Sequence, residues 1–145
     1  MPACMIRRMS MRFLSAAIVL SGWLVMFQSG SFAGEVQDMD VIARAASGPL
    51  ACEIRKAVIG EAVQLTGVVS SSVALSGQAR FLLSKSGPSG ASNINQGNAF
   101  DLVGGTETYV SHVTLNLRHE DRIVIEFIAT PKDGVDCHAT ANLEF

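Results

Sequence analysis

Hydrophobic and polar residues alternate along most of the chain from Leu50 to its C-terminal end. A period of two is typical of β-strands that bury one face and expose the other. The alternation is most regular after Gly134, where Val135, Cys137 and Ala139 are separated by polar residues. The pattern predicts seven strands, over residues 50–58, 61–70, 77–85, 99–103, 108–117, 122–130 and 135–145.

Short turn signals separate these segments, among them Gly104-Gly105 and the Pro-Lys-Asp-Gly stretch over residues 131–134. Proline and Asp-Gly both occupy positions that turns favour. No sustained helical period occurs in this region. Short strands separated by turns at intervals of roughly eight to twelve residues are typical of sandwiches. We therefore predict an all-β, seven-stranded immunoglobulin-like β-sandwich domain over residues 50–145.

The stretch from Ser86 to Asn98 interrupts the alternation, because Ile94 is its one larger apolar residue. We interpret it as a long polar loop between the third and fourth predicted strands. A disordered loop and an ordered, functional loop both remain open, since long loops in compact domains are often functional and Asn side chains order turns. It lacks the Gly-Lys-Ser/Thr ending and the following helix of a phosphate-binding loop.

The N-terminal residues 1–33 have the pattern of a secretory signal peptide. Arginines precede an uncharged apolar run over residues 13–27, and a small-x-small motif ends at Ala33. The run is shorter than the ~20 residues that span a bilayer, so we predict cleavage after Ala33, export to the periplasm and no membrane attachment afterwards. Residues 34–49 show no sustained pattern, and we interpret them as a flexible leader.

The predicted exported part is acidic. All 13 Asp and Glu residues follow Ala33, whereas three of the 11 Lys and Arg residues precede it, so the net charge of this part is about −5. An acidic domain is a poor partner for nucleic acid, and we expect no nucleic-acid binding.

Two cysteines, Cys52 and Cys137, follow the predicted signal peptide, on core-facing positions of the first and last predicted strands. An even count in an oxidising compartment indicates one disulfide. Such a bond would stabilise the fold by about 4–5 kcal/mol in the chain-entropy model. The alternative is a pair of buried free thiols.

The sequence offers little support for catalysis or metal binding. His112, His119 and His138 are scattered and lack the spacing of metal ligands. Cys137 and His138 point to opposite faces of a strand, and a disulfide would remove the thiol that a nucleophile needs. We expect no enzyme activity, no metal and no cofactor.

The segment SGPSGASNINQGNAFDL, followed by an LNL strand and Asp-Arg, resembles the curli assembly CsgC/CsgH family. In that family a basic strand end leads into Gly-Gly-x-Ser-Asn-x-x-Gln and then a short x-x-Leu-x-Leu strand. The resemblance covers about residues 50–145. The matching residues are Lys85, Gly90, Ser92, Asn93, Gln96, Phe100, Leu102, Leu115, Asn116, Leu117 and Asp121.

The chain departs from the enterobacterial branch of the family at one motif. That branch carries a Cys-x-Cys pair just before the third strand, where this chain has Leu75 and Gly77. The departure argues against thiol–disulfide chemistry and places the sequence nearer the alphaproteobacterial, CsgH-like branch.

The resemblance implies a periplasmic, non-catalytic and chaperone-like domain that inhibits amyloid formation by a curli-type subunit, which is the expected partner. We expect a monomer. Our hypothesis is that the subunit contacts the outward face of the third predicted strand together with the polar loop. The residues proposed for this contact are Gln78, Arg80, Leu82, Ser84, Lys85, Asn93, Asn95 and Gln96.

Arg80 and Lys85 would supply cationic donors to an acidic client. The alternative is that both charges only keep an edge strand soluble and unpaired. The segment NINQGNA also resembles a compressed form of the repeat spacing of curli subunits, so mimicry of the client by the loop stays open. It occurs once, whereas repeat proteins need several stacked copies, so the chain is not itself a curli subunit.

Two other functions remain open at this stage. A structural or adhesive domain of a fibre system would co-assemble with fibres and not block them. A thiol–disulfide redox protein would need at least one reactive, accessible cysteine.

Overall fold

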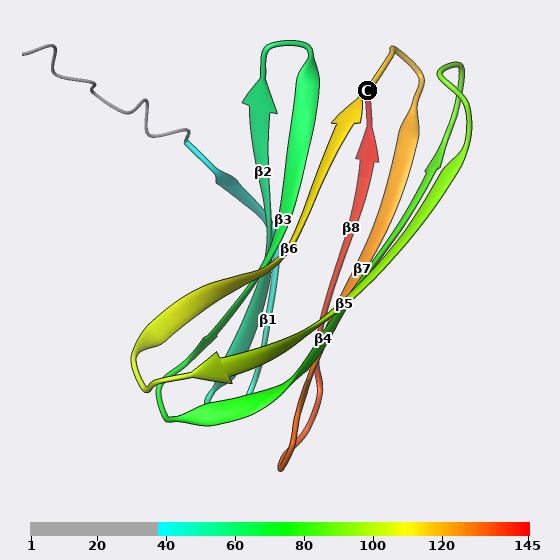
Figure 1. Cartoon of the computed structure of the whole chain (residues 1–145). Coiled ribbons are helices and arrows are strands. Elements are labelled where there is room, and N and C mark those ends of the chain that lie inside the picture. The colour runs from blue at the N-terminus through cyan, green and yellow to red at the C-terminus, as the bar shows by residue number, and fades with distance from the viewer. Residues whose placement is uncertain (1–37) are drawn as a thin grey trace, which may run out of the picture. The chain divides into compact units, whose positions relative to one another are not determined.

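The computed structural model describes residues 38–145, which form eight β-strands and no helix (Figure 1). None of these residues therefore belongs to a helix that is long and apolar enough to cross a membrane. The predicted signal peptide and the first four residues of the predicted leader lie outside the described residues. The strands are β1 (Asp40–Ser47), β2 (Leu50–Ile59), β3 (Ala62–Ser71), β4 (Leu75–Ser86), β5 (Ser92–Leu102), β6 (Thr106–Asn116), β7 (Arg122–Pro131) and β8 (Cys137–Glu144).

The strands form two four-stranded antiparallel sheets that pack face to face (Figure 1). Sheet A has the order β1-β2-β3-β6, and sheet B has the order β5-β4-β7-β8. Strands β2 to β8 correspond to the seven predicted strands, and the predicted all-β sandwich is confirmed. The structure adds an eighth strand, β1, at the edge of sheet A.

Strand β1 corrects the prediction of a flexible leader over residues 40–47. It pairs with β2 from Asp40 opposite Lys56 to Ser47 opposite Leu50, with one irregularity near Ala43. Its apolar residues are only partly buried against the core, and several are alanines. Small, half-exposed residues give a weak hydrophobic alternation, so the strand was not recognisable from the pattern.

Strand β5 corrects the prediction of a long polar loop. Residues 92–98 belong to this strand, which pairs with β4 from Ser92 opposite Lys85 to Leu102 opposite Leu75. Only residues 87–91 connect the two strands. Because β5 lies at the edge of sheet B, most of its side chains need not be apolar, and the polar composition was mistaken for a loop.

The core lies between the sheets and is filled by the inward residues of both. Phe81 of β4 and Phe127 of β7 are fully buried, and their rings meet in a tilted arrangement at 5.9 Å between centroids. A disulfide joins Cys52 of β2 to Cys137 of β8 and therefore links sheet A to sheet B. The predicted disulfide is confirmed, and it fits an oxidising compartment.

Candidate functional site

The outward face of sheet B carries most of the predicted contact residues. Along β4, the side chains of Gln78, Arg80, Leu82 and Ser84 alternate with the buried residues of the core. Strand β4 lies between β5 and β7 and is a central strand. The alternative that Arg80 protects an edge strand from pairing is therefore wrong.

This face mixes apolar and polar side chains, because Leu82 lies beside Glu126 and Arg80 lies beside Ile128 on the two central strands. Leu82 lies opposite Asn95 of β5, and Ser84 lies between Asn93 of β5 and Val124 of β7. Val124 is 55% exposed, although it belongs to a central strand. Leu82, Ser84, Asn93, Asn95, Val124 and Glu126 line a shallow groove of about 380 Å³ on this face.

Arg80 is the available cation of this face. Its neighbours across the sheet are Gly97 and Ile128, neither of which can neutralise it. It forms no ion pair with any residue of the range 38–145. Of the carboxylates on the same face, Glu144 lies 3.3 Å from Arg122. Glu126 lies 3.8 Å from Nδ1 of His138, which forms an ion pair with it only when the imidazole is protonated. The guanidinium of Arg80 is thus exposed and free to bind an anionic group.

Lys85 does not belong to this face, which corrects the predicted contact set. Its side chain is only 8% exposed, and its Nζ lies 3.8 Å from Oδ2 of Asp121, which is fully buried. Lys85 follows Phe81 and Leu83 at spacings of two residues, so strand geometry turns it toward the interior. Its ammonium lies inside the fold beside Asp121 and is not accessible to a partner.

Asp121 connects two loops at one end of the sandwich. It accepts hydrogen bonds from the backbone N–H of Ser89 (3.1 Å) and of Arg118 (2.8 Å), and from the hydroxyl of Ser89. The hydroxyl of Ser89, the two backbone donors and the charge of Lys85 lower the pKa of Asp121 from 3.8 to about 2. Lys85 and Asp121, two residues that carried the family resemblance, therefore stabilise the fold.

Gln96 also lies apart from the other predicted contact residues. It points from β5 toward sheet A, where its Nε2 donates to the backbone oxygen of His112 (3.1 Å) and its Oε1 accepts from the His112 N–H (3.3 Å). Asn98 donates from Nδ2 to the backbone oxygen of Val110 at 2.6 Å. These side chains join edge strand β5 to edge strand β6, whereas Asn93 and Asn95 stay on the outward face.

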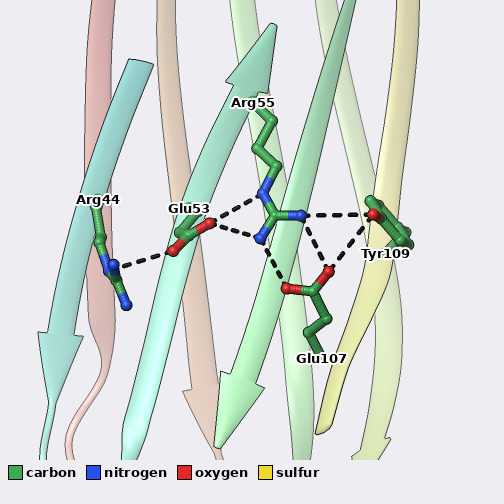
Figure 2. A network of polar contacts seen from close by, with 5 residues as sticks. All are labelled: Arg44, Glu53, Arg55, Glu107 and Tyr109. Carbon is green, nitrogen blue, oxygen red and sulfur yellow. Dashed lines mark hydrogen bonds and ion pairs between the residues drawn. The ribbon is translucent and has the colours of Figure 1, made fainter. Parts of the chain in front are cut away.

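The outward face of sheet A carries a polar network that the sequence reasoning missed (Figure 2). Arg55 of β2 bonds Glu53 through Nε (2.9 Å) and Nη2 (2.8 Å), and reaches Glu107 of β6 with both Nη atoms (2.7 and 3.0 Å). Arg44 of β1 pairs with Glu53 at 3.2 Å, and the hydroxyl of Tyr109 lies 3.4 Å from Arg55. The network joins β1, β2 and β6 across β3.

This network is electrically balanced and structural in character. The hydrogen bonds with Glu107 raise the pKa of Arg55, and Arg55 in turn lowers the pKa of Glu107. Val68 of β3, which lies between Glu53 and Tyr109 in the sheet, is only 1% exposed although it faces outward. The sequence feature that could have indicated this network is the two-residue spacing of Glu53 and Arg55, and of Glu107 and Tyr109.

Few groups suited to catalysis or metal binding come together in the structure. Within residues 38–145, no three His, Cys, Asp or Glu side chains are placed to hold a metal ion. Cys52 and Cys137 are bonded to each other and are at most 1% exposed. Neither sulfur is an accessible thiolate, which thiol–disulfide exchange requires.

These features define a small, disulfide-linked domain of the immunoglobulin-like sandwich class. The family model for the CsgH protein matches residues 51–129. The chain belongs to the CsgH family, which confirms the resemblance found in the sequence.

Solved structures agree with this assignment. The solution structure of CsgH from R. palustris is similar, with 25% sequence identity, coverage of 66% of this chain and 91% of that chain, and a TM-score of 0.52. The E. coli curli protein CsgC shares the fold, with 16% identity, coverage of 63% and 93%, and a TM-score of 0.50. No curated protein matches the sequence significantly.

Proposed function

We propose that this protein is a periplasmic, non-catalytic inhibitor of premature polymerisation by a curli-type amyloid subunit. Membership of the CsgH family supports a role in curli assembly. The disulfide between Cys52 and Cys137 supports export to an oxidising compartment. Export through the predicted signal peptide is part of the proposal.

The observation that supports inhibition most directly is the open outward face of sheet B. A sheet face can bury the apolar side chains of an extended client against Leu82 and Val124, while Asn93 and Asn95 supply carboxamide hydrogen bonds. In such a contact, the inhibitor presents a sheet face to the client and no unpaired strand edge. Because amyloid grows by addition of strands to edges, a client strand that lies against a face is not extended by the inhibitor.

Arg80 gives this face its electrostatic preference. Its guanidinium is exposed and unpaired among the described residues, in a domain whose overall charge is negative. Charge complementarity of this kind accelerates encounter and selects partners more than it adds affinity. The face therefore favours client segments that combine apolar and acidic residues.

The test compares Arg80→Glu with the control Lys132→Glu, which makes the same change of charge at an exposed position outside this face. Growth of fibres by a purified curli subunit is followed by thioflavin fluorescence. We expect the wild-type protein and Lys132→Glu to delay growth at low molar ratio. Arg80→Glu should need about tenfold more protein for the same delay, as the loss of one interfacial charge contact predicts.

Two results would contradict the proposal. If the wild-type protein leaves the fibre kinetics unchanged at equimolar dose, it is not an inhibitor, and its incorporation into the fibres would indicate a structural role. If Arg80→Glu inhibits as well as Lys132→Glu, the client binds elsewhere on the protein.

A further inference from the structure

The loops at one end of the sandwich expose a group of apolar side chains, here called the valine end. Four loops, over residues 48–49, 72–74, 103–105 and 132–136, lie together at this end, which is the lower end in Figure 1. Val73, Val103 and Val135 project from three of them and are 50%, 72% and 74% exposed. Hollows of about 320, 220 and 300 Å³ lie between the loops, and Pro49 lines each of them.

These loops hold one another in place. Backbone hydrogen bonds connect them, from the N–H of Ser72 to the oxygen of Pro49 (3.3 Å), of Gly105 to that of Ser71 (2.8 Å) and of Lys132 to that of Ser76 (2.9 Å). A Cβ at Gly104 would lie only 3.0 Å from the oxygen of Ser72, so the loop between β5 and β6 packs directly against the loop between β3 and β4. The valines are therefore presented by a fixed backbone.

A fixed apolar surface of this kind is suited to binding. Single exposed apolar residues are ordinary, whereas a group of them marks an interaction site. Valine has few rotamers to lose, and a preorganised loop loses little further entropy when a partner covers it. The three valines can thus be buried by a partner at a small entropic cost.

Acidic side chains surround the valine end. Asp101, Asp133 and Asp136 are all exposed. Asp101 and Asp133 form no ion pair within residues 38–145, and Asp136 has only a distant neighbour, Nε2 of His138 at 4.0 Å. Lys132 is the one basic residue of the four loops. The rim of the valine end is therefore negatively charged.

We propose that the valine end is a docking surface for a protein partner whose contact surface combines aliphatic side chains with Lys or Arg. An apolar centre with a polar rim is the usual anatomy of a protein interface, and the acidic rim selects a basic partner. A second copy of this chain would bring two acidic rims together, and an anionic membrane would be repelled. The inference goes beyond the proposed function, because the Arg80 face favours acidic segments and the valine end favours basic ones.

The test uses a blocked peptide of alternating Val and Lys as the probe, and the same peptide with Glu in place of Lys. Binding to the purified protein is followed by two-dimensional NMR. We expect the Lys peptide to shift the backbone signals of Val73, Val103 and Val135. The Glu peptide should leave these signals unchanged, because the acidic rim repels it.

Variants measure the apolar contribution. Val103→Ser and Val135→Ser each remove apolar area from the contact, and each should weaken binding of the Lys peptide about fivefold. The matched control is Val58→Ser, since Val58 is 66% exposed near the hairpin of β2 and β3 at the opposite end. It should bind the peptide as the wild-type protein does. None of the three should change the thermal midpoint, because these side chains are exposed.

A second pair of variants measures the charge. Asp133→Lys should weaken binding about fivefold, and added salt should weaken binding to the wild-type protein more than to this variant. Glu61→Lys changes the net charge equally at an exposed position at the opposite end and serves as the control. Equal losses in both variants would mean that the peptide responds only to the overall charge, which would overturn the proposal.

Three other outcomes would also overturn it. These are equal binding of the Glu peptide, unaltered affinity in both valine variants, and shifts at the valine end that appear without peptide, either on concentrating the protein or on adding phosphatidylcholine–phosphatidylglycerol vesicles. The last would assign this end to a second copy or to a membrane. Fibre growth is not measured here, so failure of the proposed function and failure of this docking surface are distinguishable.

Discussion

Asp121 and Lys85 show how a charged residue can serve the fold when its position suggests a surface role. Asp121 is fully buried, yet it receives two backbone N–H groups, one hydroxyl and a nearby ammonium. Hydrogen bonds to the charged form favour ionisation despite burial. Arg80 and Lys85 project from opposite faces of β4, and this makes Arg80 available to a partner and Lys85 not.

The lowered pKa of Asp121 predicts a specific acid sensitivity. Its pKa is about 2 in the folded protein and near 3.8 in an unfolded chain. The unfolded state therefore binds more protons as the pH falls, so the stabilisation is complete above about pH 4 and is lost toward about pH 2. Chemical denaturation across this range should show a steeper loss of stability for the wild-type protein than for Asp121→Asn. Identical slopes would show that Asp121 does not control the acid response.

The edge strands are the places where this domain could pair with a strand of another chain. Strand β6 ends sheet A and β5 ends sheet B, and either edge could pair with another chain. Gln96 and Asn98 satisfy backbone groups of β6 in the way that an added strand would. Side chains thus close an edge without adding a strand, which suits a protein proposed to meet amyloid-forming chains.

We predict that Gln96→Ala combined with Asn98→Ala opens the edge of β6. The loss of the side-chain hydrogen bonds should lower the free energy of unfolding by roughly 1–3 kcal/mol. The amide of His112 should exchange faster with deuterium, and dimers should appear in sedimentation experiments. Asn95→Ala, which alters the opposite face of the same strand, serves as the control. A monomeric double variant with unchanged exchange would mean that the amides do not protect this edge.

At the scale of the whole molecule, two sheets share one core and one covalent link. The disulfide joins residues that are 85 positions apart in the sequence and connects β2 to β8 across the core. A bond that closes so long a loop restricts the unfolded chain strongly. In a domain of this size it contributes a large part of the stability.

Replacement of both cysteines by alanine should lower the free energy of unfolding by about 4–5 kcal/mol in the chain-entropy model. Urea denaturation of the variant and of the wild-type protein, both without reductant, measures the difference. The circular-dichroism spectrum of the variant should keep its β-sheet form below the transition. A loss of less than about 1 kcal/mol would show that the core alone holds the sheets together.

Most of the fold was predictable because its strands bury one face and therefore alternate. The segments around Phe81, Phe127 and Cys137 were recognised for this reason, and the core-facing placement of both cysteines indicated their bond. The candidate face was predicted in part, since Arg80 and Leu82 lie outward as expected. Lys85 was misplaced because its charge was given more weight than its position two residues after Leu83.

The family, seven of the eight strands and the disulfide follow from the order of the residues, because strand period, turn composition and cysteine position are local properties. The sheet order, the edges and the partners of Gln96 and Asn98 followed only from the tertiary structure. These features depend on contacts between residues far apart in the chain, and an edge strand such as β5 tolerates polar side chains that resemble a loop. The same long-range packing brought the carboxamides of Gln64, Gln96 and Asn98 together around β6.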